Sequence, residues 1–291
     1  MGWKPYYKIP EHIKPNRYDR KSYLEVMKKL REMGVITVCE EDLCPNRYYC
    51  YSKRTVTFLA MGNICTRRCK YCNIRKGKPL MLDPKEPERI LEAAKLLGSE
   101  YIVITSVTRD DLSDGGASHL ASIARLLKKN GFLVEVLAPD FKGLKESVDI
   151  VIDSGIDVFA LNIETVERLY PEIRPGARYE RILELLRHAS RRVITKSGII
   201  LGMGESMSEV KQTIRDLAKS NVRIVTIGQY LRPGPEQIEV KRYYAMKEFK
   251  ELKMYGESLG LIVESNPLVR SSFNAYESYL KAVKNEDKNN K

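Results

Sequence analysis

The amino-acid sequence predicts an α/β protein built on a parallel β-sheet, because short apolar runs rich in β-forming residues alternate with segments of helical periodicity. The strands recur at intervals of roughly 25–45 residues, a spacing typical of βαβ units. The predicted strands are Thr55–Ala60, Tyr101–Thr105, Leu133–Leu137, Asp157–Asn162, Val193–Lys196 and Val222–Ile227. The predicted helices are Lys21–Leu30, Glu86–Leu97, Leu120–Lys129, Tyr179–Ala189 and Met207–Ala218, the last capped by Ser206 or Ser208.

Six βα units fit either a doubly wound sheet or an incomplete barrel, and periodicity alone leaves both open. In both folds, chemistry is expected at the carboxyl ends of the strands. Candidate binding residues at these ends are Thr105 and Asp110 after the second strand, Asn162 and Glu164 after the fourth, and Lys196 after the fifth. An aspartate in this position also caps helices, and a strand-end lysine is often simply solvated.

Composition indicates a folded, water-exposed protein, with 43% hydrophobic and 30% charged residues. No apolar signal segment opens the chain and no apolar run is long enough to cross a bilayer, so we expect a cytoplasmic protein without a membrane partner. The formal net charge of +12 favours an acidic partner or a Lys/Glu-rich surface of the kind thermophiles carry.

All six cysteines fall into two groups of three. Cys65, Cys69 and Cys72 form C-x3-C-x2-C just after the first predicted strand, and Cys39, Cys44 and Cys50 form C-x4-C-x5-C upstream. In a reducing compartment such spacing favours metal binding over disulfides. Structural zinc usually takes four ligands, whereas three thiolates on one short loop suit a cubane iron–sulfur cluster with one iron left open.

The group at 65–72, with Tyr71 before its last cysteine, resembles the radical S-adenosylmethionine (SAM) superfamily, in which SAM chelates the open iron. The segment Cys39-Glu40-Glu41-Asp42-Leu43-Cys44-Pro45-Asn46 with Cys50 resembles the auxiliary-cluster motif of lipoyl synthases. This second resemblance covers roughly residues 35–275 and is far more specific than any single motif. Its further matches are Thr105–Ala117, Glu135–Phe141, Asn162–Thr165, Arg174–Ala177, Thr195–Gly198, Gly228–Leu231 and Val269–Phe273.

The resemblance implies a partial (β/α)6 radical SAM barrel over residues 53–260. An N-terminal extension, residues 1–52, would carry the auxiliary cysteines, and a C-terminal extension, residues 261–291, would carry Arg270-Ser271-Ser272 and a frayed tail. It further implies two [4Fe–4S] clusters and SAM as cofactors. Ser272 would be the fourth auxiliary ligand, and Asn162 and Glu164 would contact SAM.

The implied activity is sulfur insertion at C6 and C8 of an octanoyl chain, with the auxiliary cluster as sulfur donor. The substrate would be an octanoylated lysine on a lipoyl carrier domain or H-protein, and ferredoxin or flavodoxin would supply electrons. The chain departs from the family where Ala160 and Leu161 replace Asn-His, where no histidine stands near Gln237, and where Phe273 replaces tyrosine.

Two other functions fit part of the pattern. A radical SAM methylthiotransferase acting on tRNA would also exploit positive charge, but no separate RNA-binding domain is evident. A non-catalytic iron–sulfur electron-transfer or scaffold protein would not cleave SAM. Tyr48, Tyr49 and Tyr51 flank Cys50, and we favour their shielding a cluster over their stacking on nucleic acid.

Overall fold

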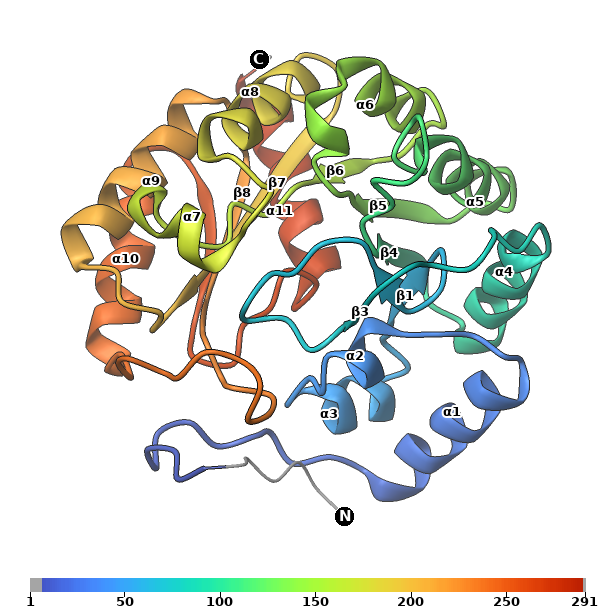
Figure 1. Ribbon diagram of the computed structural model, residues 1–291, viewed down its shortest axis with the longest axis horizontal. Coiled ribbons are helices and arrows are strands. Elements are labelled where there is room, and N and C mark those ends of the chain that lie inside the picture. The colour runs from blue at the N-terminus through green and yellow to red at the C-terminus, as the bar shows by residue number, and fades with distance from the viewer. Residues whose placement is uncertain (1–6, 290–291) are drawn as a thin grey trace.

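The computed structural model describes residues 7–289 and, as far as Asn285, their side chains. Its main sheet is entirely parallel, and its strands lie side by side in chain order. Doubly wound sheets reverse their strand order at a switch point, so this uninterrupted order identifies the incomplete barrel (Figure 1). The strands are β1 (Thr57–Ala60), β4 (Tyr101–Ser106), β5 (Leu133–Leu137), β6 (Val158–Ala160), β7 (Ile194–Leu201), β8 (Ile224–Gln229) and β9 (Ile262–Ser265).

Helices cover the outside of this curved sheet, as Figure 1 shows, and a second group of helices lies below the β1 edge. The outer helices are α4 (Glu86–Leu97), α5 (Ala117–Lys129), α6 (Lys145–Ile152), α8 (Tyr179–Ala189), α9 (Met207–Lys219) and α10 (Met246–Ser258). The remaining elements are α1 (Arg20–Glu32), α2 (Val38–Glu41), α3 (Arg47–Ser52), β2 (Ile64–Cys65), β3 (Arg75–Lys76), η1 (Phe141–Gly143), η2 (Glu167–Leu169), α7 (Tyr170–Ile173) and α11 (Ala275–Asn289). Within residues 7–289, no helix has the length and apolar character needed to cross a membrane.

The sequence prediction locates most barrel elements correctly. The bounds of β5, α4 and α8 agree residue for residue, and Ser206 caps α9 in a capping box with Glu209. The prediction misses β9, α6 and α10. It also ends β7 too early, because Gly198 resembles a strand terminus. The backbone of α11 is helical through Asn289, where the sequence predicts a frayed tail from Lys284 onward.

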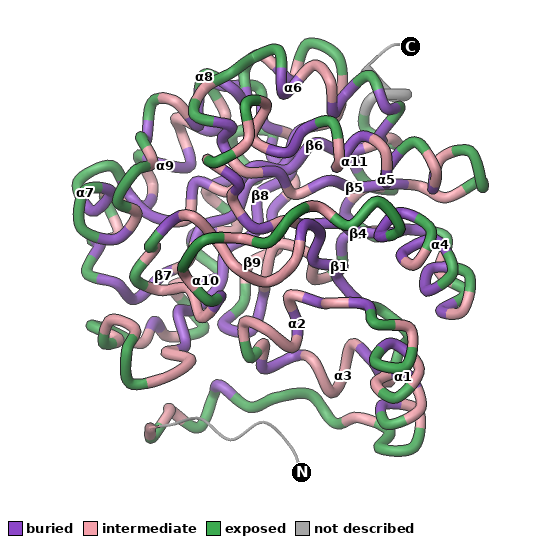
Figure 2. Tube along the Cα trace, turned by 45° about the vertical axis from the view of Figure 1, so that its right-hand side comes forward, coloured by how far each residue is buried: buried purple, intermediate pink, exposed green. Residues whose placement is uncertain are grey.

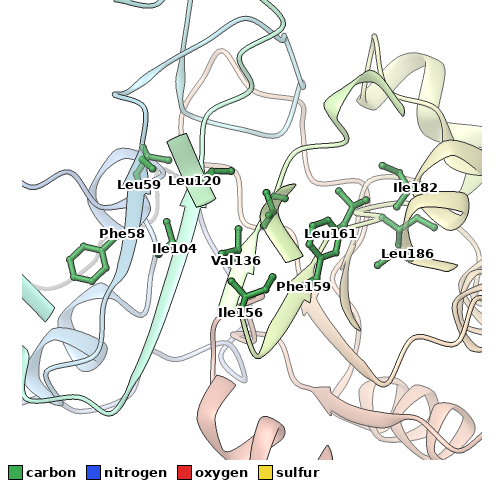
Figure 3. Close-up of a cluster of buried hydrophobic side chains, with 14 of the residues drawn as sticks. Phe58, Leu59, Ile104, Leu120, Val136, Ile156, Phe159, Leu161, Ile182 and Leu186 are labelled. Carbon is green, nitrogen blue, oxygen red and sulfur yellow. The ribbon is translucent and has the colours of Figure 1, made fainter. Parts of the chain in front are cut away.

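The two faces of the sheet differ in chemistry. Phe58, Ile104, Val136 and Phe159 are paired in register on the outer face, where they pack toward helices such as α8 (Figure 3). The tube in Figure 2 shows this buried layer running through the sheet and the inward sides of the helices. The inner face of the sheet instead carries the polar and ionisable side chains Thr57, Glu135, Lys196 and Thr226. These polar side chains place the candidate chemistry inside the barrel.

Candidate metal and cofactor site

The downstream cysteine triplet stands on a short loop directly after β1. Cys65 belongs to β2, which pairs with β3, so Cys69 and Cys72 lie on the connection between two paired strands. The Cys65 sulfur accepts hydrogen bonds from the backbone N–H groups of Arg67 and Thr108, both at 3.4 Å. The bond from Thr108 ties the Cys65 sulfur to the loop that follows β4.

A buried arginine holds this loop to the barrel. The Arg67 guanidinium donates to Asp110 at 2.8 and 3.0 Å and lies 2.5 Å from Asp140, which also pairs with Arg181. Burial alone would raise the pKa of Asp140, but the hydrogen bond and charge of Arg67 lower it below its usual value. Asp110, predicted to bind a cofactor, also positions the cysteine loop, because Arg67 donates to both its carboxylate oxygens.

Asn162 and Glu164 meet at the carboxyl end of β6, as predicted for a binding pair. Asn162 Nδ2 donates to Glu164 Oε1 at 3.0 Å, and Tyr71 from the cysteine loop hydrogen-bonds to the same carboxyl group. Glu164 has a left-handed backbone, with φ of 65°, and bridges to Ile199 on β7. A non-glycine residue held in this conformation is typical of functional sites.

Several polar atoms around this pair are buried without a partner. They are Asn162 Oδ1, Glu164 Oε2 and Arg174 Nε. Burial raises the pKa of Glu164, although Arg174 opposes the shift. Since an unsatisfied buried polar atom costs free energy, this group suits a polar ligand.

Arg174 is a site residue whose role sequence reasoning missed. Its Nη1 donates to the carbonyls of Asn162 and Ile163 and to Tyr170 Oη, at 2.9 to 3.2 Å. Burial raises the pKa of the Cys69 thiol, and Arg174 opposes this by charge and hydrogen bonding. The signal was present, since Arg174-Pro175-Gly176 is part of the family resemblance, but no motif gave the arginine a partner.

The upstream triplet is enclosed by packing. Cys39 lies in α2 and is buried, and Cys50 lies in α3. Burial first, and the neighbouring Cys44 second, raise the pKa of Cys39 to about 12 and also raise the pKa of Cys50. The backbone N–H of Cys44 donates to the carbonyl of Cys39 at 3.1 Å, so these two cysteines stand on one turn. Metal binding would reverse the shift, because the ligand is the thiolate.

Aromatic rings surround this triplet. Tyr51 is fully buried and its hydroxyl lies 2.6 Å from Thr37 Oγ1, while Tyr48 packs against Tyr18 and Tyr23 at 5.3 and 4.8 Å between ring centroids. Tyr49 lines a cavity of about 480 Å³ with Tyr48, Pro45, Arg17 and neighbouring residues of the N-terminal segment. Tyr48 and Tyr51 are therefore part of the packing around Cys39 and Cys50.

Hydrogen bonds join the two cysteine loops. The backbone N–H of Asn73, next to Cys72, donates to Asp42 Oδ1 at 2.7 Å. The Asn73 side chain donates to the carbonyl of Glu41 at 2.8 Å. Asp42 stands between Cys39 and Cys44, so the two triplets belong to one connected structure.

The Arg270-Ser271-Ser272 segment contacts residues that lie beside each of the two cysteine triplets. Ser272 Oγ accepts a hydrogen bond of 2.7 Å from Thr57 Oγ1, and the Thr57 backbone hydrogen-bonds to the Cys39 thiol. Ser271 Oγ accepts from Asn162 Nδ2 at 2.5 Å. Asn46, two residues after Cys44, donates to the carbonyl of Leu268 at 2.5 Å. The C-terminal segment therefore lies across the barrel interior.

Two other predicted binding residues are already engaged. Lys196 is buried, and its ammonium lies 2.9 and 3.0 Å from the carboxylate of Glu135, which also accepts from the Tyr101 hydroxyl. The alternative of a solvated lysine is therefore wrong, since the ammonium group is buried and paired with Glu135. Thr105 Oγ1 donates to the carbonyl of Leu137 at 3.1 Å.

The positions at which this chain departs from the family pattern include Ala160 and Leu161 at the end of β6 and Gln237 after β8. Ala160 and Leu161 are buried at the end of β6, directly before Asn162. Gln237 lies in the segment after β8, where its carbonyl accepts from Arg232 at 2.8 Å.

The residues fit the implied groups in donor chemistry. All six cysteines are free thiols, three in each group. Within residues 7–289, no three Cys, His, Asp or Glu side chains converge closely enough for a single metal ion. A cubane cluster makes a different demand, since its thiolates bind separate iron corners. The unpartnered Asn162 Oδ1 and Glu164 Oε2 suit the amino group of SAM.

Comparison with known families now defines the class. Residues 59–217, more than half of the chain, match the family model described as the Radical SAM superfamily. Solved structures show the same fold: methylornithine synthase (PylB) has a TM-score of 0.58 at 12% identity, covering 91% of this chain and 77% of that one. The [FeFe]-hydrogenase maturase HydG has a TM-score of 0.56 at 17% identity, covering 84% and 62%.

Curated relatives give the particular family. The lipoyl synthase of Sulfolobus acidocaldarius is 47% identical over 274 residues, covering 93% of this chain and 96% of that protein. The lipoyl synthase of Aquifex aeolicus is also 47% identical over 274 residues, covering 92% and 99%. The chain belongs to the lipoyl synthase family of the radical SAM superfamily.

Proposed function

We propose that the protein inserts sulfur at C6 and C8 of an octanoyl chain carried on a protein lysine, forming lipoyl-lysine. Family membership over almost the whole chain carries this proposal. Two separate thiol triplets, joined through Asn73 and Asp42, suit a reaction that needs both a radical source and a sulfur donor. When bound, the catalytic cluster with SAM supplies a 5′-deoxyadenosyl radical, and the auxiliary cluster supplies sulfur.

The chain's residues divide this work. Cys65, Cys69 and Cys72 would hold the catalytic cluster, and Arg67 fixes their loop from the ends of β4 and β5. Asn162 and Glu164 would bind SAM through their free oxygens. A polar cofactor at this end of the strands leaves the apolar side chains beneath it for an alkyl substrate.

That apolar layer is formed by inner-face residues of neighbouring strands. Thr105 pairs with Leu59 on one side and with Leu137 on the other, and Leu137 pairs with Ala160. Residues paired in this way point to the same face of the sheet, so Leu59, Leu137 and Ala160 share the inner face. Ala160, one of these residues, stands two positions before Asn162 in the chain. An alkyl radical requires surroundings that offer few competing groups, and such a layer meets that need.

Cys39, Cys44 and Cys50 would hold the auxiliary cluster, with Ser272 as the fourth ligand. The hydrogen bond from Thr57 supports this role, since Thr57 also contacts Cys39. A serine oxygen binds iron less firmly than a thiolate, which suits an iron that must leave as sulfur is used.

The partners follow from charge and chemistry. We propose an octanoylated lipoyl carrier domain or H-protein as substrate and an electron donor such as ferredoxin or flavodoxin. A net charge of +12 favours docking of acidic proteins, and docking should weaken as salt rises. A reducing, cytoplasmic setting would keep the six thiols available for iron.

Anaerobic reconstitution with an octanoylated lysine peptide tests the function. The product should gain two sulfurs and lose two hydrogens by mass spectrometry. Replacing Cys65, Cys69 and Cys72 with Ala should abolish SAM cleavage, whereas replacing Cys39, Cys44 and Cys50 should spare cleavage and stop sulfur insertion. SAM cleavage without any sulfur-containing product from the native protein would contradict the proposal.

Ser272→Ala tests the fourth ligand in the same assay. This variant should keep SAM cleavage and most iron but lose lipoyl product. Full product formation would remove Ser272 from the ligand set.

A further inference from the structure

Two adjacent serines connect to two different parts of the site. Ser272 Oγ accepts from Thr57, which hydrogen-bonds to Cys39 of the auxiliary triplet. Ser271 Oγ accepts from Asn162, which lies beside Glu164 at the candidate SAM position. Their Cα atoms are about 3.8 Å apart across one planar peptide, so a displacement of one serine also moves the other.

The contact with Ser271 fixes the orientation of Asn162. The Asn162 amide nitrogen has two donors, and both are engaged, one by Ser271 Oγ and one by Glu164 Oε1. Because the amide group is planar, these two bonds determine where Asn162 Oδ1 points. That oxygen is buried and has no partner, so it is held ready for a donor from a ligand.

Two glycines allow the segment to lie this close. A Cβ on Gly198 of β7 would stand 2.9 Å from Asn162 Oδ1 and 3.0 Å from Ser271 Oγ. A Cβ on Gly228 of β8 would stand 2.1 Å from the carbonyl oxygen of Val269. A side chain at Gly228 would collide with the backbone of the segment, and one at Gly198 would crowd the side-chain ends of Asn162 and Ser271, so the close approach depends on these glycines.

We propose that Ser271 is a positioning residue that couples the auxiliary site to SAM binding. With Ser272 held at the auxiliary site, Ser271 orients Asn162 for SAM, and release of Ser272 relaxes that orientation. By thermodynamic reciprocity, SAM binding in turn stabilises the arrangement that holds Ser272. This inference rests on the proposed function only for the identity of the two sites.

The test is the dissociation constant of SAM, measured anaerobically by equilibrium dialysis with the catalytic cluster oxidised, so that no SAM is cleaved. In the native background, replacing Cys39, Cys44 and Cys50 with Ala should weaken SAM binding about fivefold, the worth of one hydrogen bond. Ser271→Ala should weaken it to about the same extent with the auxiliary cluster present. In Ser271→Ala, removing the auxiliary cysteines should then have no further effect.

Gly198→Ala provides a second route, since the added methyl group would crowd both Asn162 Oδ1 and Ser271 Oγ without removing either side chain. As in Ser271→Ala, the SAM dissociation constant of Gly198→Ala should no longer change when the auxiliary cysteines are removed. Ser154→Ala is the matched control, because Ser154 is also a buried serine but donates to Val151 at the end of α6. It should leave the SAM dissociation constant unchanged.

A Ser271→Ala protein that binds SAM as tightly as the native protein would overturn the proposal. So would a response to the auxiliary cysteines that persists in Ser271→Ala. Neither result depends on sulfur insertion. An absence of lipoyl product would count against the proposed function alone, because SAM affinity is measured without turnover.

Discussion

The two cysteine triplets are held in place by different forces. Ion pairs from neighbouring strand ends fix the Cys65–Cys72 loop, with Arg67 bound between Asp110 and Asp140. Around Cys39 and Cys50, the chain is held by packed tyrosine rings and by the buried contact between the hydroxyl groups of Tyr51 and Thr37. Asp110 and Asp140 reach the first loop from other strand ends, and Tyr71 of this loop hydrogen-bonds to the carboxyl group of Glu164. The second triplet is instead enclosed, as suits a group kept from water.

The largest loss of stability should come from removing the ion pairs that hold the Cys65–Cys72 loop. Arg67→Ala leaves the fully buried carboxylate of Asp140 with Arg181 as its remaining charged partner, and should destabilise the apoprotein by about 3–5 kcal/mol in urea denaturation. Arg168→Ala is the control, since Arg168 pairs with Glu209 at the surface, and it should cost less than about 1 kcal/mol. Equal losses in the two variants would mean that the buried network does not hold the loop.

A smaller effect should come from the aromatic side. Tyr51→Phe keeps the ring but removes the hydroxyl that meets Thr37 Oγ1, and should destabilise the apoprotein by about 1–2 kcal/mol. Tyr276→Phe removes a comparable but exposed hydroxyl bond to Glu100 and should change the free energy of unfolding by less than about 0.5 kcal/mol. Similar values for both would show that burial adds nothing to the Tyr51 contact.

The smallest effect concerns pH. A hydrogen bond from Arg168, above all, lowers the pKa of Glu209 from 4.5 to about 2. Since the folded-state pKa is the lower one, this stabilisation is present above about pH 4.5 and is lost as pH falls toward 2. Because the pair is exposed and screened, Glu209→Gln should reduce stability by less than about 1 kcal/mol at pH 7. The difference from native should shrink in acid, and a constant difference from pH 7 to pH 3 would contradict the assignment.

The sequence predicts the barrel because its signals are local. Apolar periodicity locates β5, α4 and α8 residue by residue, whereas β9 is missed because Glu264 and Ser265 make half of a four-residue strand polar. Which carboxylate meets which cation is not a local property. Asp110 follows β4 and Lys196 lies inside β7, and each is paired with a residue distant in sequence: Arg67 and Glu135 stand 43 and 61 residues away.

Prediction of the site divides in the same way. Asn162 and Glu164 lie together after β6, where the sequence predicts binding residues, because they are only two residues apart in the chain. Arg174, Thr57 and Asn73 acquire their roles only through the fold. A search for charged or amide side chains beside each cysteine loop would have suggested Arg67 and Asn73, but not their partners.

The position of residues 268–272 has a consequence for biosynthesis. Leu268 and Ser272 complete the surroundings of a triplet whose last cysteine, Cys50, is made roughly 220 residues earlier. At about 5–20 residues per second on the ribosome, the early thiols wait about 10–40 s for these contacts. Iron loading at Cys39, Cys44 and Cys50 therefore cannot reach its final surroundings until the end of the chain has been translated, which ties maturation of this site to release of the finished polypeptide.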